Sequence, residues 1–241
     1  MTADPYSLVV FDCDGVLVDS EVLCTEIEAR LLTEMGFPHT QADVVARFMG
    51  RTDGDNFARI VELMGERGAE EFDARAIEET REAFRTDLAP VAGVAEVLDA
   101  LDAEGRPYCV ASSGSHRRMR TTLGATGLWG RLEGRIYSAD DVGRGKPWPD
   151  VFIHAAAAQG HPARACVVVE DSVSGVLAGV AAGMDVLGYS GGLADADALA
   201  GAGAKTFGAM AELPDLIRAG RGRPPPRSAA PVNRDAVSRR H

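Results

Sequence analysis

The hydrophobic and polar positions of this chain form two kinds of pattern. From residue 90 onward, short apolar runs alternate with segments whose apolar residues recur every three or four positions. The runs predict buried strands and the segments predict amphipathic helices. Strands are expected at 106–111, 136–138, 166–169 and 186–189, and helices at 94–103, directly after Ser115, at 151–159 and at 174–182. This alternation predicts an α/β fold with a doubly wound parallel sheet.

Residues 21–88 follow only the helical pattern. They contain no convincing strand, although the apolar run Leu8–Phe11 before them predicts the first strand of the sheet. Helices are expected at 21–35, 42–49, 56–64 and 73–85, the first with Ser20 as its N-cap and Gly36 at its end, with breaks at glycines 50, 54, 65 and 68. We therefore expect an α/β core of residues 1–19 and 89–220 with an inserted helical domain, residues 20–88. The two hinges are expected near 18–20 and 87–93.

The end of the chain shows neither pattern. Residues 221–241 contain three consecutive prolines, six arginines and a single acid, Asp235. The absence of apolar periodicity predicts a flexible basic tail. We favour a solvated tail over one that binds an anionic partner.

The composition narrows the class of protein. The 241 residues are 46% hydrophobic and 25% charged, which suits a soluble enzyme with a sizeable core. The net charge of −11 argues against a nucleic-acid partner. No apolar run approaches the length of a membrane span and the first five residues lack a signal pattern, so we expect no membrane partner and a cytoplasmic location. The four cysteines lack the spacing of a disulfide framework or zinc site. We expect a monomer or a weak homo-oligomer.

The first candidate chemistry follows the run Leu8–Phe11. Asp12 and Asp14 come next, one residue apart, and Gly15 then allows a sharp turn. Because α/β proteins place their chemistry at the carboxyl ends of parallel strands, two carboxylates there suit a divalent cation and a phosphate. A solvated turn is the alternative, since such a pair alone is a weak signal.

Three more candidate segments follow in the chain. Ser112 ends the second expected strand, and a hydroxyl followed by free backbone amides can bind phosphate oxygens, although an ordinary turn has the same composition. Lys146 stands between a glycine and a proline before an expected helix; a solvated surface lysine is the alternative. Glu170 and Asp171 end the strand expected at 166–169, and adjacent acids repel unless they share a cation.

These segments, taken in order, resemble the four motifs of the haloacid dehalogenase superfamily. The motifs are D-C-D-G-V-L-V-D-S at 12–20, the serine at 112, G-K-P-W-P-D at 145–150 and E-D-S at 170–172, and the resemblance covers nearly all of residues 6–218. It implies a Rossmann-like core in which the helical insertion is a cap that closes over the site.

The resemblance also implies a role for each acid. Asp12 would be the nucleophile, forming an aspartyl-phosphate, and Asp14 would carry the proton to the leaving alkoxide and from the attacking water. Mg²⁺ would be the cofactor, held by the Asp12 carboxylate, the Asp14 backbone carbonyl and Asp171. Glu170 would bind or orient metal-bound water.

The same resemblance places the substrate. Lys146 and Ser112, with Ser113 and Gly114, would bind the oxygens of the transferred phosphoryl group. Arg51 in the cap would meet the leaving group, although Arg51 could equally be an ordinary surface arginine. We expect Asp19 to have a structural role in the turn.

The motifs also separate neighbouring activities. Asp14 argues against dehalogenases and phosphonatases, which lack the second acid of this motif. The sequence resembles bacterial phosphatases of hexose phosphates and 6-phosphogluconate, so the expected partner is a small phosphorylated substrate. A β-phosphoglucomutase-like mutase is the alternative, but those enzymes carry a histidine where this chain has Cys24. A non-catalytic phosphometabolite-binding protein is a third reading.

Overall fold

The computed structural model describes residues 6–48 and 53–220. The expected substrate contact of Arg51 and the expected tail, residues 221–241, lie outside this part. Within it, no helix is both long enough and apolar enough to cross a lipid bilayer. None of the four cysteines, all of which lie in this part, forms a disulfide.

The core is a six-stranded parallel sheet in the order β3-β2-β1-β4-β5-β6. Its strands are β1 (Leu8–Phe11), β2 (Tyr108–Ser112), β3 (Ile136–Ser138), β4 (Cys166–Glu170), β5 (Asp185–Tyr189) and β6 (Lys205–Phe207). The doubly wound α/β fold predicted from the sequence is confirmed. The order of strands reverses at β1, which lies between β2 and β4. In such sheets this switch point is where ligands bind.

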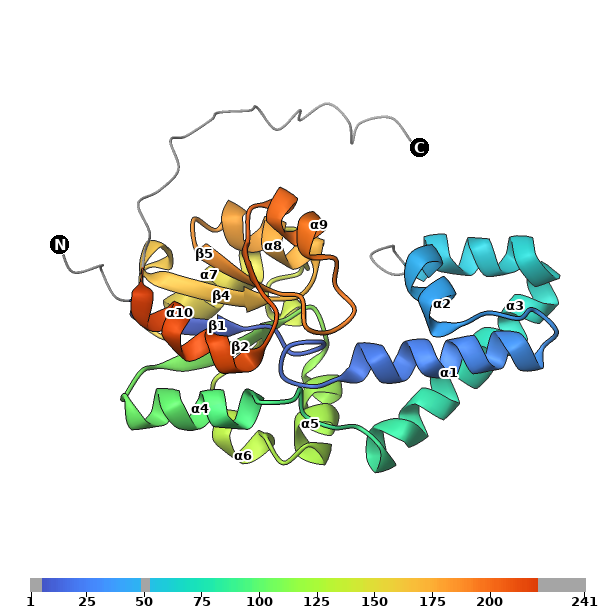
Figure 1. Ribbon diagram of the computed structural model, residues 1–241, viewed down its shortest axis with the longest axis horizontal. Coiled ribbons are helices and arrows are strands. Elements are labelled where there is room, and N and C mark those ends of the chain that lie inside the picture. Colours follow the sequence, from blue (N-terminus) through green and yellow to red (C-terminus); the bar gives the residue numbers. More distant parts are fainter. Residues whose placement is uncertain (1–5, 49–52, 221–241) are drawn as a thin grey trace.

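Helices cover both faces of the sheet (Figure 1). They are α4 (Val94–Ala103), α5 (His116–Ala125), α6 (Trp129–Leu132), α7 (Asp150–Ala158), α8 (Val173–Ala181), α9 (Ala196–Ala202) and α10 (Leu213–Ala219). Side chains alternate along β1, so Val9 and Phe11 pack in a cluster with α4, α5 and α10. Leu8 and Val10 pack on the other face with α7, α8 and α9. Burial on both faces explains why the strand is apolar throughout.

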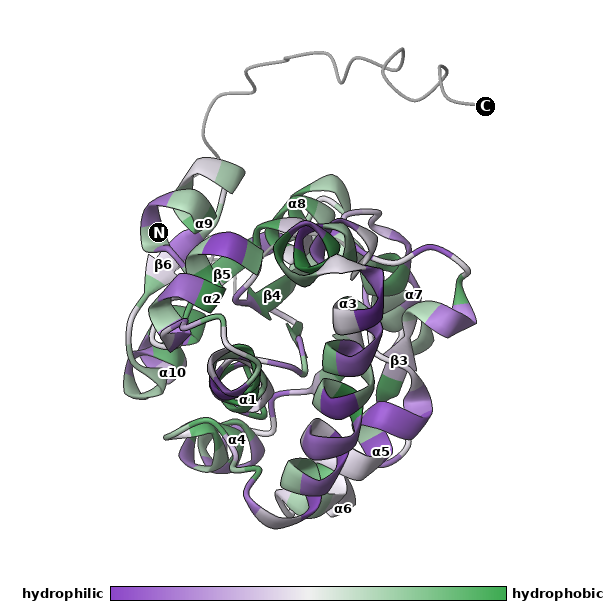
Figure 2. Ribbon diagram, turned by 90° about the vertical axis from the view of Figure 1, so that its right-hand side faces the viewer, coloured by the Kyte–Doolittle hydropathy of each residue, from purple (hydrophilic) through white to green (hydrophobic). Residues whose placement is uncertain are grey.

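Three helices between β1 and α4 form a helical block beside the sheet (Figure 1). They are α1 (Ser20–Glu34), α2 (Gln41–Phe48) and α3 (Asp53–Thr86), and they share a hydrophobic cluster of their own that includes Ile27, Leu31, Leu32 and Phe72. Figure 2 views this block end on and shows long hydrophilic stretches along α3, with hydrophobic segments at intervals. This pattern is typical of a helix with one buried side.

The chain enters and leaves the helical block through two segments that lie side by side. Val18 pairs with Pro90 in an isolated antiparallel bridge. The Asp19 backbone N–H donates to the Ala89 carbonyl at 3.0 Å, and the N–H of Val91 donates to the carbonyl of Leu17 at 3.1 Å. A movement of the block relative to the sheet would therefore act on both segments together.

Two local predictions are wrong. The glycines at 54 and 68 do not interrupt α3; only Gly65 departs from helical geometry, with φ 76° and ψ 166°. Glycine costs a helix only about 1 kcal/mol relative to alanine, and burial of nearby side chains such as Phe72 offsets such a cost. Ser20 is not the N-cap of α1 either. It is the first helical residue, and its hydroxyl donates to Asp14 Oδ1 at 2.6 Å. Gly36, at φ 92°, ends the helix as expected.

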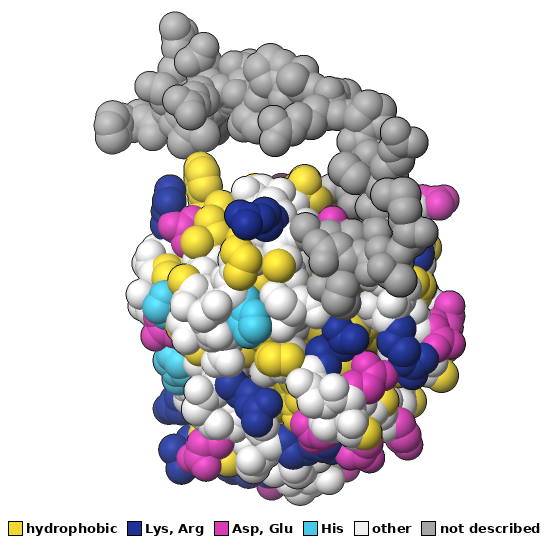
Figure 3. Space-filling view, turned by 90° about the vertical axis from the view of Figure 1, so that its left-hand side faces the viewer, with side chains coloured by type: hydrophobic (Ala, Val, Ile, Leu, Met, Phe, Trp, Pro, Cys, Tyr) yellow, Lys and Arg dark blue, Asp and Glu magenta, His cyan; other side chains and the backbone are white. Residues whose placement is uncertain are grey.

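The surface carries charges of both signs. On the face shown in Figure 3, acidic and basic side chains are interspersed rather than gathered into separate fields. Several arginines pair with acids, as Arg131 does with Asp99 at 2.7 Å and Arg144 with Asp150 at 2.6 Å. These arginines are therefore partly neutralised by neighbouring carboxylates.

Candidate active site

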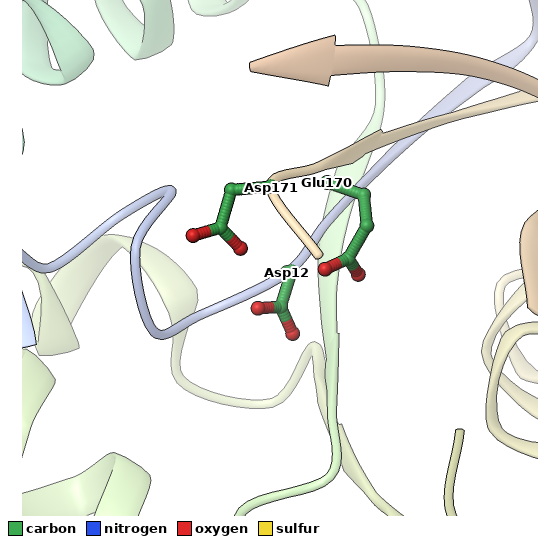
Figure 4. Close-up of side chains that lie close together, drawn as sticks. All are labelled: Asp12, Glu170 and Asp171. Carbon is green, nitrogen blue, oxygen red and sulfur yellow. The ribbon is translucent and has the colours of Figure 1, made fainter. Parts of the chain in front are cut away.

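Three carboxylates meet at the carboxyl ends of β1 and β4 (Figure 4). Asp12 directly follows β1, Glu170 is the last residue of β4, and Asp171 comes next. The parallel register holds the two ends level, and the Asp12 backbone N–H donates to the Val169 carbonyl at 2.9 Å. One oxygen from each carboxylate lies within 4.8 Å of the others, so the three side chains could hold a metal ion together.

The electrostatics of this cluster favour a cation. Burial and the neighbouring charge of Glu170 raise the pKa of Asp12 from 3.8 to about 7, against the opposing effect of Lys146. Burial, followed by the charges of Glu170 and Asp12, raises the pKa of Asp171 well above its ordinary value. These shifts reflect the cost of gathering carboxylates away from water, and a divalent cation would offset that cost.

Two glycines make room for the carboxylates. A Cβ on Gly15 would lie 2.0 Å from Asp171 Oδ2, and a Cβ on Gly175 would lie 2.0 Å from Glu170 Cδ. Gly15 also has φ 78°, a conformation that other residues rarely adopt. Glu170 Oε1 accepts the Ser172 hydroxyl at 2.7 Å and its N–H at 3.1 Å. The backbone thus shapes a close-fitting set of hard oxygen ligands, the kind that Mg²⁺ prefers.

Lys146 lies between two carboxylates of this cluster, those of Asp12 and Glu170. Its Nζ is 2.5 Å from Asp12 Oδ1 and 2.7 Å from Glu170 Oε2, and its side chain is only 4% exposed. Nζ also lies 4.9 Å from the centre of the Phe152 ring. Burial lowers the pKa of this amine, but the two carboxylates outweigh burial and raise it above its ordinary value. The alternative of a solvated surface lysine is therefore wrong.

The loop after β2 lies beside this group. Ser112 is buried, and its Oγ accepts the N–H of Gly114 at 3.0 Å. The hydroxyl of Ser138 donates to the Gly114 carbonyl at 2.8 Å and fixes the loop from β3. A Cβ on Gly145 would lie 3.5 Å from Ser113 Oγ, which places the segment before Lys146 against the same loop. The structure thus brings the residues expected to bind phosphate into one region.

The side chain of Asp14 has different neighbours. Its Oδ1 accepts the Ser20 hydroxyl and Arg118 Nη2, the latter at 3.0 Å, and its Oδ2 accepts Arg118 Nε at 3.3 Å. Sequence reasoning did not single out Arg118, which the structure places against the Asp14 carboxylate. It lies in the first turn of α5, and nothing in its local sequence distinguishes it from the arginines beside it.

Two other expected residues lie near the start of the helical block. Asp19 takes the N-cap position of α1, although its side chain makes no capping hydrogen bond. Burial and the charge of Glu26 raise its pKa. Cys24 is partly buried on α1, and burial, followed by the charge of Glu21, raises the pKa of its thiol to about 12. Cys24 is therefore a neutral side chain at physiological pH.

The fold and these strand-end residues define a class of hydrolases built on a doubly wound sheet. The chain matches the model of the haloacid dehalogenase-like hydrolase family over residues 9–189, and it belongs to that family. The family resemblance inferred from the motifs is confirmed. Residues 9–189 include all of β1 but its first residue, the three helices of the block, Lys146, and β4 with the acidic pair at its end.

Characterised relatives act on phosphate esters. The chain is 31% identical to the 6-phosphogluconate phosphatase of Escherichia coli over 186 residues, which span 74% of this chain and 80% of that protein. It is 29% identical to the phosphorylated carbohydrates phosphatase of Thermotoga maritima over 212 residues, which span 87% of this chain and 97% of that protein.

A solved structure supports the same family. A haloacid dehalogenase family hydrolase from Deinococcus radiodurans, crystallised with phosphate and sodium, superimposes with a TM-score of 0.81 at 32% identity. The match covers 90% of this chain and 97% of that one. The likeness therefore includes the helical block as well as the sheet.

Proposed function

We propose that this hydrolase is a Mg²⁺-dependent phosphatase of a sugar phosphate or sugar-acid phosphate and that it acts through an aspartyl-phosphate on Asp12. Phosphoric monoester hydrolysis is the activity that the family and its phosphatase relatives support. The observation that carries the proposal is the position of Asp12, buried at the switch point between Lys146 and the acidic pair. A carboxylate held there can attack a phosphoryl group whose charge the site offsets.

Asp12 would act as the nucleophile. Its Oδ1 is engaged by Lys146, so Oδ2 is the oxygen available for in-line attack. The new bond forms between Oδ2 and phosphorus while the ester oxygen leaves with the bonding pair. Lys146 and Ser112 would hold the phosphoryl oxygens, with the Ser113 and Gly114 amides completing the site.

Mg²⁺ fits the donor set beside the nucleophile. Asp12, Asp171 and the backbone carbonyl of Asp14 would hold the ion, and Glu170 would bind or orient one of its water ligands. When bound, the ion would offset the negative charge of the carboxylates and of the phosphate.

Asp14 would carry the proton in both half-reactions. It would protonate the leaving alkoxide, and then take a proton from the water that hydrolyses the aspartyl-phosphate. Its carboxylate is separate from the three-acid cluster, because Ser20 and Arg118 hold it. That separation suits a group that exchanges protons with the substrate rather than one that binds metal through its side chain.

We also propose that residues 20–88 act as a cap over a core made of residues 1–19 and 89–220. Closure of the cap would exclude bulk water during attack, and Arg51 would meet the leaving group. The cytoplasm and a monomer or weak homo-oligomer remain our expectations for the working state.

The test is a hydrolysis screen with the full chain. Substrates are sugar phosphates, sugar-acid phosphates, nucleotides and phosphoglycolate, each assayed for phosphate release after exhaustive chelation and again with Mg²⁺ restored. We expect turnover of sugar or sugar-acid phosphates only with Mg²⁺. Undiminished turnover after chelation would refute the metal site, and no turnover of any ester would favour the non-catalytic alternative.

A further inference from the structure

The carboxylate of Asp14 is held in place by hydrogen bonds from two other side chains. Three hydrogen bonds reach its carboxylate, one from the Ser20 hydroxyl and two from the Arg118 guanidinium. Two donors from one planar group define the rotation of a carboxylate as well as its place. Arg118 is itself held in the first turn of α5, where its backbone N–H donates to Ser115 Oγ at 3.2 Å.

The fixed carboxylate lies beside the expected phosphate site. A Cβ placed on Gly114 would lie 3.6 Å from Asp14 Oδ2, 3.4 Å from Ser112 Oγ and 3.4 Å from Arg118 Cδ. These three side chains therefore converge on one glycine. Asp14 Oδ2 and the Ser112 hydroxyl therefore both border the same position in the loop after β2.

Arg118 also contacts the helical block. Its guanidinium lies 5.2 Å from the centre of the Phe84 ring. Phe84 is buried and lies near the end of α3, just before the chain returns to the core. Ser20, the other donor to Asp14, is the first residue of α1. Asp14 thus contacts the first helix of the block through Ser20, and the last helix indirectly, through Arg118.

The guanidinium of Arg118 stays protonated beside Asp14. Burial opposes the charge, but the charge and hydrogen bonds of Asp14 outweigh burial and raise the pKa of the guanidinium above its ordinary value. The charge of Glu21 of α1 adds to the same effect. The side chain is therefore a permanent cation that faces Asp14.

We propose that Arg118 is a positioning residue for the proton carrier. It holds Asp14 Oδ2 against Gly114, in the loop that carries Ser112 and at which the ester oxygen of a bound phosphate would leave, and it couples this orientation to α3 through Phe84. This inference rests on the proposed phosphatase function, in which Asp14 protonates the leaving group. Arg118 acts through Asp14 and need not touch the substrate.

The test compares two substrates that differ in their need for a proton. A sugar phosphate leaves as an alkoxide and needs protonation, whereas p-nitrophenyl phosphate leaves as a stable phenolate and does not. The measured quantity is kcat/KM, which reports the steps up to formation of the aspartyl-phosphate. Variants are Arg118→Gln and Arg118→Lys. The matched control is Arg117→Gln, which removes the same charge from an exposed neighbour on α5.

We expect Arg118→Gln to lower kcat/KM for the sugar phosphate about tenfold or more, because general acid catalysis depends on a positioned acid. The loss with p-nitrophenyl phosphate should stay below about threefold, since that step uses no proton. Arg118→Lys keeps the charge and one donor, so it should recover part of the loss. Arg117→Gln should change neither value.

A substitution of Phe84 tests the contact between Arg118 and α3. Phe84→Leu should produce the same selective loss to a smaller degree, and the double variant Arg118→Gln/Phe84→Leu should lose little beyond Arg118→Gln. Residues that act through one contact are not additive in this way. Fully additive losses would overturn the coupling to α3.

Equal losses with both substrates would overturn the positioning role, because a structural residue or a direct phosphate ligand affects both alike. Unchanged kcat/KM with both would overturn it too. Partial unfolding cannot imitate the expected result, since both substrates are measured on one preparation. If the parent enzyme hydrolyses neither substrate, the proposed function fails first, and that outcome is distinct from a failure of the Arg118 variants alone.

Discussion

Asp12 and Asp14 are two residues apart, yet their side chains have opposite surroundings. Asp12 is buried among other carboxylates, which raises its pKa, and it pairs with Lys146, which opposes that rise. Asp14 accepts hydrogen bonds from Ser20 and Arg118 outside that cluster. Two carboxylates on one turn can therefore take different roles, because their environments and not their residue type decide what each can do.

The nucleophile is the first residue-scale prediction. Asp12→Asn keeps the size of the side chain but removes the charge that attacks phosphorus, so phosphate release should fall by about a thousandfold or more. Asp140→Asn is the matched control, since Asp140 is exposed and its side chain is away from the acidic cluster. The measurement is steady-state phosphate release with Mg²⁺ present. Full activity in Asp12→Asn would contradict the proposed mechanism.

Some of the site could be predicted from local sequence and some could not. Asp12, Glu170 and Asp171 each end an apolar run, and parallel strands bring their carboxyl ends to one edge. Lys146 needed the family motif, because a single lysine between turns is locally ambiguous. Arg118 gave no local signal at all, since its partner Asp14 is 104 positions away. Long-range pairs of this kind depend on the fold rather than on the neighbouring sequence.

At the scale of elements, prediction worked for most of the helices and strands up to residue 189. The expected helix at 94–103 and strand at 136–138 agree with the structure, and most other bounds differ by one or two residues. No elements were expected after residue 189, although α9, β6 and α10 lie there. β6 is a three-residue edge strand and α9 is rich in alanine and glycine, so neither has a clear apolar period.

The second prediction concerns the first turn of α8. In Gly175→Ala the added Cβ would meet the Glu170 carboxylate, which would have to move away from the cluster. Displaced ligand-orienting groups typically cost about ten- to a hundredfold in metal affinity or activity. The measurement is the Mg²⁺ concentration that gives half-maximal activity.

Gly124→Ala is the control for that substitution. Gly124 lies in α5, and a Cβ there would meet nothing within 4 Å. Alanine is the better helix former, so this variant should gain about 0.5–1 kcal/mol of stability and keep the parental metal dependence. An unchanged Mg²⁺ requirement in Gly175→Ala would show that the close approach at Glu170 is unimportant.

The third prediction concerns α1 in the helical block. Glu28 lines a cavity with Phe48, Ile60 and Phe72. Burial, followed by the charge of Glu21, raises the pKa of Glu28 from 4.5 to about 7. Folding therefore favours the protonated form between these two values. The resulting penalty on stability is small below about pH 4.5 and complete above about pH 7.

Glu28→Gln should remove this penalty. The variant should be more stable than the parent by up to about 3 kcal/mol at about pH 8, and by less than about 1 kcal/mol at about pH 5. The measurement is thermal or denaturant unfolding at both pH values. Glu70→Gln, at an exposed position of α3, should show no such pH-dependent gain. A gain in Glu28→Gln that is independent of pH would contradict the ionisation argument.

For the whole molecule, the question is where the phosphoryl group goes. In the proposed mechanism the sheet would supply the nucleophile and the phosphate-binding groups, and the helical block would supply the side chains that meet the rest of the substrate. A mutase must hold a second sugar hydroxyl against the aspartyl-phosphate, and a hydrolase must admit water. The side chains of the block therefore bear on this choice.

Cys24 bears directly on that choice. It lies on α1, at the position where the β-phosphoglucomutases that this chain resembles carry a histidine. Its thiol is neutral because its pKa is raised to about 12. A neutral thiol is a weak hydrogen-bond donor and cannot orient a sugar oxygen as an imidazole does. Water is then the better acceptor, and we expect net phosphate release with little interconversion of glucose 1- and 6-phosphates. Phosphorus NMR of a β-glucose 1-phosphate reaction separates these products, and stoichiometric isomerisation without free phosphate would establish the mutase instead.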